Sequence, residues 1–435
     1  MKFAPRRWLT ALFLSLTGCV SAVSESVWHG ARYAGKFNTA PVRLPRVYSE
    51  RAREMRGIWI ATVGNLDFPR CETPEVFQQR VRKLMKDLAA AGFNAVFFQV
   101  RPTNDAFYPS QLNPWSRFLT GTEGKPLAQG FDPLRFLIGE AHRNGLEFHA
   151  WLNPYRVARA TRLSKKDYLL TLDPRNFARK NPHLVMETFA DGERKLTLNP
   201  GEPAVRSFVT ATVMELVRNY ALDGIHFDDY FYPDYAPAAA DAATFRKYGS
   251  GKLTQADWRR GNVNLLIQTL HREIAAYNRA NRRKVRFGVS PAGIWRNRKN
   301  TPLGSLTGGV ESYEIHCADT LLWVKSGWLD YIVPQLYWNF NHDTAAYAAL
   351  CDWWSQAVRG TRTELYIGQG LYRLGESGWD RHELYRQLLY NQKHPEIKGS
   401  LFFSLRNWEK PANAVQRSGG RDMLRILWQK RVPAR

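Results

Sequence analysis

The sequence predicts an α/β fold, a (β/α)8 TIM barrel with long βα loops at its C-terminal face. Eight short apolar runs alternate along the chain with amphipathic segments, which is typical of a parallel sheet with crossover helices. No glycine-rich fingerprint follows the first run, so an open dinucleotide-binding sheet is disfavoured. Polar residues stand where most of the runs end, which is where barrel enzymes build their sites.

The expected strands are short apolar runs bounded by turn residues. They are Met55–Thr62, Ala95–Val100, Glu147–Leu152, Gly224–Asp228, Arg286–Ser290, Tyr331–Tyr337, Leu365–Gln369 and Gly399–Leu405. Polar groups at their C-terminal ends would be costly to bury unpaired, and a solvated pocket at the barrel mouth removes that cost. Capping of neighbouring loops is the structural alternative, but it accounts for only a few of these groups.

The expected helices lie between these runs and have apolar side chains at helical spacing. They are Pro74–Ala91, Pro133–Asn144, Pro203–Tyr220, Gln255–Asn281, Ala318–Lys325, Thr344–Val358, Arg381–Gln392 and, after the eighth strand, Arg421–Gln429. Three connections from strand to helix are long, at residues 101–130, 153–202 and 295–316. All three would lie on the C-terminal face of the barrel.

The first residues carry an export signal. Lys2, Arg6 and Arg7 form a positive n-region, and the apolar run that follows is too short to span a bilayer as a mature helix. This run ends in Leu16-Thr17-Gly18-Cys19, a pattern that resembles the bacterial lipobox, in which the cysteine is lipidated. An ordinary signal peptide with a chance cysteine is the alternative.

We therefore expect residues 1–18 to be a lipoprotein signal peptide, residues 19–54 to be a tether lipidated at Cys19, and residues 55–435 to form the barrel domain. Val20 is not the aspartate associated with retention at the inner membrane, so the expected location is the periplasmic face of the outer membrane. More than one acyl chain would give a stable anchor. No later stretch is long and apolar enough to cross a membrane.

The chain is strongly basic, with a formal net charge of +23. Such a charge concentrates polyanions near the protein. Nucleic acid would be the usual partner, but export argues against it, and an anionic envelope polymer such as peptidoglycan fits the compartment better. A basic surface without a specific partner is the alternative. The sequence does not predict an oligomeric state.

Cys71, Cys317 and Cys351 remain once Cys19 is assigned to the lipid. An odd number does not describe a disulfide framework, and no pair has the spacing of metal ligands. A Cys317–Cys351 bridge in an oxidising compartment and buried free thiols are both open. No metal or cofactor is expected.

Alternation of side chains separates the two aspartates that end the fourth expected strand. Asp228 lies on the same face as His226, whereas Asp229 lies on the face of Ile225 and Phe227, which is the more apolar. The apolar face should contact the helices, so Asp228 is expected to point into the barrel mouth. Asp229 would join it only if the strand has already begun to turn.

Aromatic residues crowd the same rim, namely Trp115, Trp151, Tyr155, Tyr232, Trp295, Tyr337, Trp338, Tyr372 and Trp408. Aromatic faces stack on the C–H faces of sugars, and a wet cleft lined by aromatic rings, amides and carboxylates suits an oligosaccharide. About half of these rings are expected to belong to the core instead.

Six segments give the chain a resemblance to a known family. They are Met55-Arg56-Gly57-Ile58-Trp59, Phe98-Gln99-Val100-Arg101-Pro102, Ala150-Trp151-Leu152-Asn153-Pro154-Tyr155-Arg156, Leu198-Asn199-Pro200-Gly201, Asp223-Gly224-Ile225-His226-Phe227-Asp228-Asp229-Tyr230 and Pro334-Gln335-Leu336-Tyr337-Trp338. With them the chain resembles the glycosyl-hydrolase-like family 10 proteins, related to bacterial envelope lipoproteins that cleave peptidoglycan glycan strands. The resemblance spans about Met55 to Trp408 and implies a TIM barrel, glycoside hydrolase activity and a site around Asp228.

The segment at the fourth strand is also similar to the chitinase-type Asp-Gly-x-Asp-x-Asp-x-Glu motif. It departs from that motif at two positions, where His226 replaces the first inner aspartate and Tyr230 replaces the final acid. The substrate-assisted chitinase mechanism is therefore not carried over.

Glycoside hydrolysis generally needs two carboxyl groups, one to protonate the leaving oxygen and one to act as nucleophile or base. We expect Asp228 to be the nucleophile or charge stabiliser, with Asp229 as its neighbour. The second acid is open, and Glu314 is our choice among the upper-loop candidates Asp105, Glu314, Asp319, Asp343 and Glu409. Asp319 would alternatively cap the helix that follows it.

Other side chains near the strand ends are expected to bind sugar hydroxyls or to position the carboxylates. They are Gln99, Arg101, Asn153, Tyr155, Gln335, Tyr337, Trp338 and Trp408. Arg101 would alternatively hold Asp228 ionised through an ion pair and so lower its pKa.

These features predict a glycosidase that cleaves O-glycosyl bonds in a cell-envelope polysaccharide, with peptidoglycan glycan strands as the expected substrate. The alternative from another class is a catalytically inactive lipoprotein barrel that anchors or senses peptidoglycan, and the missing chitinase-type acid favours it. A metal-dependent deacetylase is the third reading, but His226 has no second histidine near it in the sequence.

Overall fold

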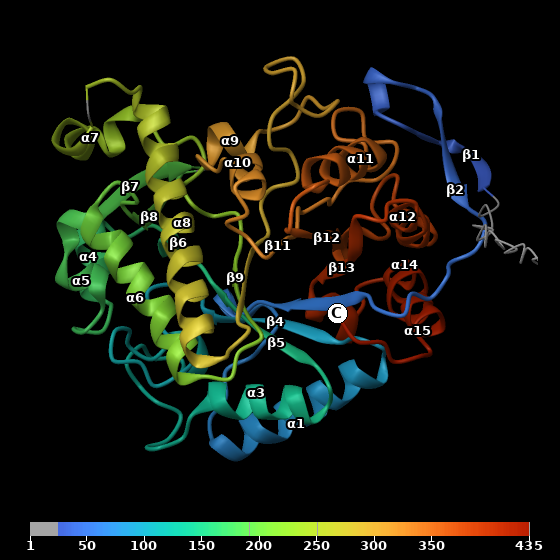
Figure 1. The fold of residues 1–435 in the computed structure, drawn as a ribbon. Helices are drawn as coiled ribbons and strands as arrows, with labels where there is room; N and C mark the ends of the chain where they lie inside the picture. The colour runs from blue at the N-terminus through green and yellow to red at the C-terminus, as the bar shows by residue number, and fades with distance from the viewer. Residues whose placement is uncertain (1–24, 191, 250, 435) are drawn as a thin grey trace, which may run out of the picture.

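Eight parallel strands close a barrel in the computed structural model, which describes residues 25–190, 192–249 and 251–434 (Figure 1). Around the barrel they are β3 (Met55–Ile60), β4 (Ala95–Arg101), β5 (Glu147–Leu152), β9 (Gly224–Phe227), β10 (Arg286–Val289), β11 (Tyr331–Ile332), β12 (Glu364–Gly370) and β13 (Ile397–Phe403). Pairing of β13 with β3 closes the ring. All eight expected strands are present, and the predicted fold class is confirmed.

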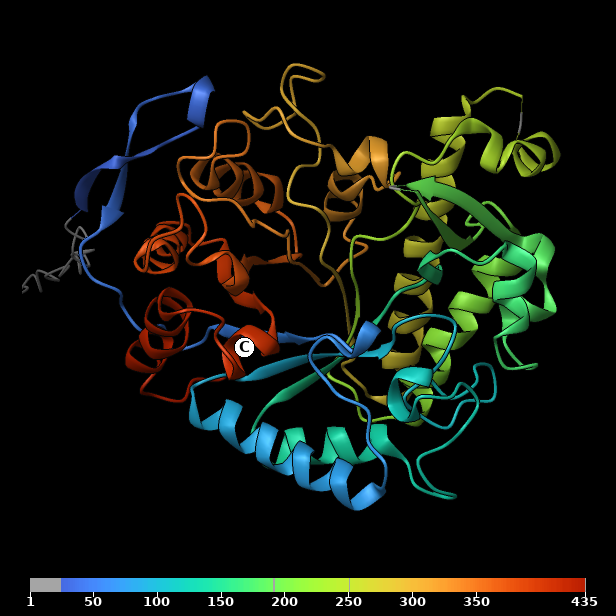
Figure 2. The same cartoon turned by 180° about the vertical axis from the view of Figure 1, so that it is seen from behind.

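The helices that follow these strands surround the barrel (Figures 1 and 2). They are α1 (Pro74–Ala90), α3 (Pro133–Arg143), α6 (Pro203–Asn219), α8 (Gln255–Asn281), α10 (Thr320–Lys325), α11 (Tyr347–Val358), α12 (Glu383–Gln392) and α15 (Met423–Leu427). Several begin at a side chain that accepts a hydrogen bond from the first turn, such as Thr73 before α1 and Thr254 before α8. All eight expected helices are therefore present in the structure, and their ends differ from the expected ends by up to three residues.

The long connections at the C-terminal face carry structure of their own. The connection after β5 forms a three-stranded antiparallel sheet in the order β6-β8-β7. This connection contains β6 (Arg156–Thr161), β7 (Val185–Ala190), β8 (Glu193–Leu198), α4 (Lys165–Leu170) and α5 (Phe177–Lys180). The short helices of the other connections are α2 (Arg117–Thr120), α7 (Ala242–Tyr248), α9 (Ser312–Ile315), α13 (Leu405–Glu409) and α14 (Ala414–Gln416). The connection after β9 contains α7.

The expected tether is partly wrong, because residues 25–45 form a hairpin that packs on the barrel. Its strands are β1 (Glu25–Arg32) and β2 (Pro41–Pro45), and Figure 1 shows them beside α12. Val42 and Leu44 are buried, and the guanidinium of Arg386 in α12 lies 3.9 Å from the ring of Trp28. An alternating pattern of only five residues in β2 is too short to stand out in the sequence.

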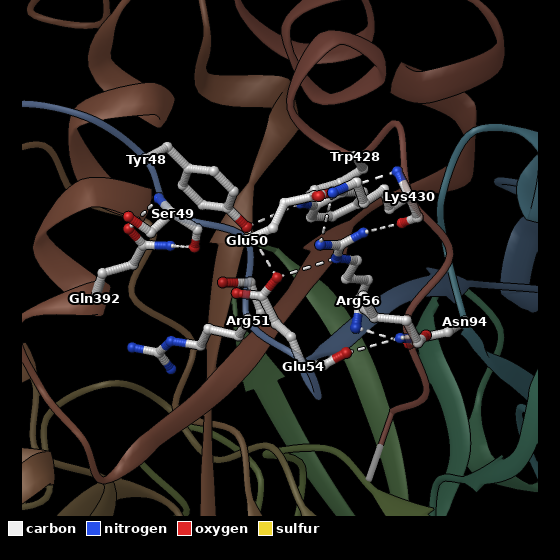
Figure 3. Close-up of polar contacts among 12 residues, drawn as sticks. Tyr48, Ser49, Glu50, Arg51, Glu54, Arg56, Asn94, Gln392, Trp428 and Lys430 are labelled. Atoms are coloured by element: carbon white, nitrogen blue, oxygen red, sulfur yellow. Dashed lines mark hydrogen bonds and ion pairs between the residues drawn. The ribbon is translucent and has the colours of Figure 1, made fainter.

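Figure 3 shows how the segment before β3 and the C-terminal segment hold each other at the N-terminal end of the barrel. Arg56 is fully buried and donates to Oε2 of Glu54 and to the carbonyl oxygen of Lys430, at 3.0 Å each. Asn94 donates to the carbonyl oxygen of Glu54 at 2.7 Å and to that of Val432 at 3.0 Å. These contacts close the end of the barrel that lies opposite the strand C-termini.

Large rings fill the interior of the barrel because glycines on adjacent strands leave room for them. A Cβ atom on Gly224 would lie 2.2 Å from the ring of His149, and one on Gly288 would lie 2.2 Å from the ring of Tyr331. Both rings are buried, and the side chain of Phe97 stacks on His149 at 4.3 Å. The interior of the barrel is therefore a packed core.

The cysteines within the described ranges carry free thiols. Cys71, Cys317 and Cys351 are all buried and unbridged, so the Cys317–Cys351 bridge is wrong and the alternative of buried thiols is confirmed. Cys19, the expected lipidation site, lies outside the described residues. In the described part of the chain, helices long and apolar enough to traverse a bilayer are absent.

Candidate active site

A cavity of about 450 Å³ opens at the C-terminal ends of the barrel strands. Its walls combine aromatic rings with amides, arginines and two carboxyl groups. The side chains used below are Trp59 on β3, Gln99 on β4, Trp151 on β5, Asp228 and Asp229 after β9, Ser290 after β10, Gln335 and Tyr337 after β11, Tyr372 after β12 and Phe403 at the end of β13. Arg156 and Arg159 of β6 complete one side.

Asp228 is 4% exposed and is held by donors on three sides. Its Oδ2 accepts a hydrogen bond from Nε1 of Trp151 at 3.2 Å and another from Nδ2 of Asn153. Its Oδ1 accepts from the backbone N–H of Tyr230 at 3.3 Å, and the guanidinium of Arg156 lies 4.0 Å from Oδ2. The predicted inward orientation of Asp228 is confirmed.

Gln99 fixes the orientation of the side-chain amide of Asn153. Its Oε1 accepts from the backbone N–H groups of Thr62 and Val63 at 2.9 Å, so its Nε2 must donate, and it does so to Oδ1 of Asn153 at 2.6 Å. This leaves Nδ2 of Asn153 to donate to Asp228. Gln99 and Asn153 were both predicted for the site, and the structure shows Asn153 in contact with Asp228 and Gln99 in contact with Asn153.

Burial raises the pKa of Asp228 to about 6, with the charge of Asp229 adding to the effect and the guanidinium of Arg156 opposing it. Burial also raises the pKa of Asp229, and the charge of His316 lowers it in part. Two neighbouring carboxylates in a buried site ionise together only at a high cost, so this pair retains one proton more readily than isolated carboxyl groups do. One acid and one base can therefore coexist here near neutral pH.

Asp229 lines the same cavity as Asp228, which corrects the expectation from alternation that it faces the helices. β9 ends at Phe227, so the chain has already turned when it reaches Asp229 and the alternation of the strand no longer applies. A hydrogen bond from the amide of Gln335 offsets part of the rise that burial causes in the pKa of Asp229. Gln335 also donates to the carbonyl oxygen of Ser290 at 2.9 Å, which confirms that it lies at the cavity.

His226 lies beneath the cavity and is fully buried. Its Nε2 is 3.1 Å from the donor Nε1 of Trp59 and 3.0 Å from Oγ of Ser290, and its Nδ1 is 3.3 Å from the hydroxyl of Tyr331. Burial holds its pKa well below 6.5, so the ring is neutral. Within the described residues, His, Cys, Asp and Glu side chains do not gather in a group of three or more that would hold a metal ion.

Glu314 does not reach the cavity, so our choice of second acid is not supported by the geometry. Its side chain is 48% exposed and forms ion pairs with Arg260 and Arg296, at 3.4 Å each. The other upper-loop candidates also lie outside the cavity lining. Asp319, for example, accepts from the backbone N–H of Leu322 and caps α10, as the structural alternative predicted.

Arg101 is buried away from the cavity, and the expectation that it binds sugar or pairs with Asp228 is wrong. It donates to the carbonyl oxygen of Asn153 at 2.6 Å and to Oδ1 of Asn104 at 2.7 Å. The pairing between β4 and β5 shifts register between Gln99 and Arg101, so these two residues do not share a face as strict alternation would require. Arg156 is the guanidinium beside Asp228.

Of the four aromatic residues predicted to bind sugar, Tyr337 lines the cavity as expected and the other three lie outside it. Tyr155 is fully buried in the core. Trp408 packs on Phe93 with ring centroids 4.9 Å apart, on the outer side of the barrel. Trp338 is half-buried and packs against the main core cluster.

Trp59, Arg156 and Arg159 were missed as site residues. Trp59 and Arg156 stand in the segments that carried the family resemblance, which is the signal that pointed to them. Gly368 on β12 makes room for the indole of Trp59, because a Cβ atom there would lie 2.9 Å from the ring. Arg159 lies in a connection without a clear pattern, and only the fold brings it to the site.

Comparisons with known proteins agree on one family. The family model "Glycosyl hydrolase-like 10" matches residues 54–385. The chain is 40% identical over 383 residues to "Glycosyl hydrolase YngK" of Bacillus subtilis (strain 168), covering 85% of this chain and 72% of that protein. It is 38% identical over 426 residues to "Glycosyl hydrolase DigH" of Escherichia coli (strain K12), covering 93% of each.

A solved structure supports the fold. The glycoside hydrolase domain of PgaB (BpsB) from Bordetella bronchiseptica is similar with a TM-score of 0.55 and 17% identity, covering 86% of this chain and 99% of that one. At that level of identity the similarity shows the barrel architecture alone. From the family model and the two relatives, we conclude that the chain belongs to the glycosyl hydrolase-like 10 family.

Proposed function

We propose that this protein is a glycosidase that cleaves O-glycosyl bonds in peptidoglycan glycan strands, with Asp228 and Asp229 as its catalytic carboxyl groups. The observation that carries the proposal is that both carboxyl groups line one aromatic-walled cavity at the mouth of the barrel. Membership of a glycosyl hydrolase-like family and relatives named glycosyl hydrolases support the reaction type.

The contacts of the two carboxyl groups suggest how they divide the work. Asp228 receives hydrogen bonds from Trp151, Asn153 and the backbone of Tyr230, and all three donors favour its ionised form. Burial raises the pKa of both groups, so the pair keeps one proton more readily than isolated carboxyl groups do. In the proposed reaction Asp228, with its three donors, carries the negative charge that faces the anomeric carbon, and Asp229 delivers the proton. That proton passes to the leaving glycosidic oxygen as the C1–O bond breaks, and water supplies the new hydroxyl group.

The walls of the cavity suit a polysaccharide. Trp59, Trp151, Tyr337, Tyr372 and Phe403 offer apolar faces, and the amides and carboxyl groups between them offer partners for sugar hydroxyls. The net charge of +23 favours an anionic polymer over a neutral one. Both features support a glycan strand that carries acidic groups.

The location proposed for the protein follows from its sequence. Cleavage before Cys19 and lipidation of that residue would anchor the chain at the periplasmic face of the outer membrane, where peptidoglycan lies within reach. Labelling with a radioactive or clickable fatty acid tests this step. Incorporation should be lost in Cys19→Ala, and equal labelling of both proteins would contradict the anchor.

The full-length protein, purified in detergent, is to be incubated with intact peptidoglycan and with stem-peptide-free glycan strands, and the products are to be analysed by mass. New reducing ends are expected from the wild type and not from Asp228→Asn. Binding of the strands without product from either protein would favour the alternative, a barrel that anchors or senses peptidoglycan. A chelator in a parallel reaction tests the deacetylase reading.

A further inference from the structure

A second cavity, of about 270 Å³, adjoins the candidate active site. It lies between the three-stranded sheet of β6, β7 and β8 and the segment that follows β9. Arg156, Arg159 and Tyr230 line both cavities, so the two spaces share one wall. A glycan whose cleaved bond sits at Asp228 would place a neighbouring sugar unit in this second space.

The shared wall is cationic. The guanidinium of Arg156 lies over the ring of Tyr230 at 4.5 Å and donates to Oδ1 of Asn153 at 2.7 Å, so it is held in place. The side chain of Arg159 is exposed and forms no hydrogen bond or ion pair with the described residues. A guanidinium that lines a cavity and has no partner in the protein is free to bind an anion through bidentate hydrogen bonds.

The far side of the second cavity contains the opposing charges. Asp234 is held by Nζ of Lys195 at 3.0 Å and by Nε2 of His316 at 2.9 Å, so its charge is compensated locally. Glu193 adds one further carboxylate at the rim, on the strand β8. The positive charge that remains uncompensated is therefore at the end that adjoins the active site.

We propose that Arg159, together with Arg156, forms a subsite for the free carboxylate of an acidic sugar unit next to the cleaved bond. This inference rests on the proposed function and adds the substituent that the site selects. The ring of Tyr230 separates the two spaces and supplies an apolar face for the same sugar. A neutral sugar would leave Arg159 unpaired, whereas a carboxylate would give it a charge-assisted partner.

The test compares two glycans that differ only in this group. Stem-peptide-free strands have free carboxylates on their muramic acid units, and chemical reduction converts these to alcohols on the same backbone. The values of kcat/KM for both glycans are to be measured with the full-length wild type, with Arg159→Gln and with Arg279→Gln. Arg279 is an exposed arginine of α8 without a partner within the described ranges, and it does not line either cavity.

Arg159→Gln should lower the ratio of kcat/KM on the carboxylate strands to kcat/KM on the reduced strands about 10- to 100-fold, as expected for the loss of one charge-assisted contact. Arg279→Gln should match the wild type on both. Equal activity of Arg159→Gln and wild type on the carboxylate strands, or an equal loss on both glycans, would overturn the subsite.

Failure of the subsite and failure of the proposed function give different results. If the wild type cleaves neither glycan, the glycosidase proposal fails, and the Kd of each protein for each glycan then decides the subsite. The wild type should bind carboxylate strands more tightly than reduced strands, and Arg159→Gln should lose that preference. A wild type without such a preference would contradict the inference in either case.

Discussion

Nε1 of Trp151 lies 3.2 Å from Oδ2 of Asp228, so a residue of β5 holds a carboxylate that follows β9. The two strands are neighbours in the barrel, with Trp151 opposite His226 in their register. This contact places the indole at the wall of the cavity and the carboxylate at its floor.

Asp228→Asn should stabilise the fold at pH 8 by about 1–3 kcal/mol and have no stabilising effect at pH 4. Burial raises the pKa of Asp228 from 3.8 to about 6, so the folded protein binds this proton more tightly than the unfolded chain. The contribution of Asp228 to stability therefore falls as pH rises from about 4 to 6 and stays low above that range. Urea unfolding at both pH values measures the effect, and a stabilisation of equal size at pH 4 would contradict it.

Asn153→Ala should move the acidic limb of the pH profile of kcat/KM to higher pH and lower its maximum about 10- to 100-fold. The change removes a donor to the ionised form of Asp228, so the pKa of that carboxyl group rises further. The exposed amide of Asn281 at the end of α8 provides the control Asn281→Ala. A lower maximum with an unmoved limb would mean that Asn153 acts on the substrate alone.

Arg101→Met and Arg156→Gln should separate folding from catalysis. Arg101→Met leaves the carbonyl oxygen of Asn153 and Oδ1 of Asn104 without a donor in the core and should cost about 3 kcal/mol or more. Arg156→Gln removes the guanidinium beside Asp228 and should cost only about 1 kcal/mol, with a clear loss of kcat/KM. Denaturant unfolding and steady-state kinetics on both variants check this, and the reverse pattern would refute the assignment.

Gly288→Ala should destabilise the barrel by about 1–3 kcal/mol. The added methyl group would lie 2.2 Å from the ring of Tyr331, which is buried between β10 and its neighbours and has no room to move. Gly261 in α8 has open space around its Cβ position, so Gly261→Ala is the matched control and should be neutral or stabilising. Thermal unfolding measures both, and equal Tm values would show that the barrel interior is less tightly packed than described.

The sequence predicted most of the fold, because the eight barrel strands and their helices differ in hydrophobic period and length. It also predicted the inward direction of Asp228, since β9 keeps its alternation up to Phe227. Asp229 lies two residues beyond the end of β9, where that alternation no longer applies. Where the strand ends is set by pairing with β5 and β10, which no local pattern reports.

Two kinds of site residue could not be assigned from the sequence. Arg101 was assigned to the site together with Gln99, but a shift in the register of β4 against β5 falls between the two residues, and Arg101 is buried away from the cavity. An aromatic residue that lines a cavity cannot be told from one that fills a core by the sequence alone. Tyr155 and Trp408 were therefore assigned to the rim, although both are buried elsewhere. Arg159 reaches the cavity only through the folding of the connection after β5.

Hydrolysis in water enriched in oxygen-18 measures whether the carboxyl pair of Asp228 and Asp229 hydrolyses a glycosidic bond. The wild type and Asp343→Asn, which changes an exposed carboxylate outside the cavity, should both place one heavy oxygen at each new reducing end. Asp228→Asn should bind the strands and release at least about 1000-fold less labelled product. Unlabelled product from the wild type, or labelled product from Asp228→Asn at the wild-type rate, would contradict the account.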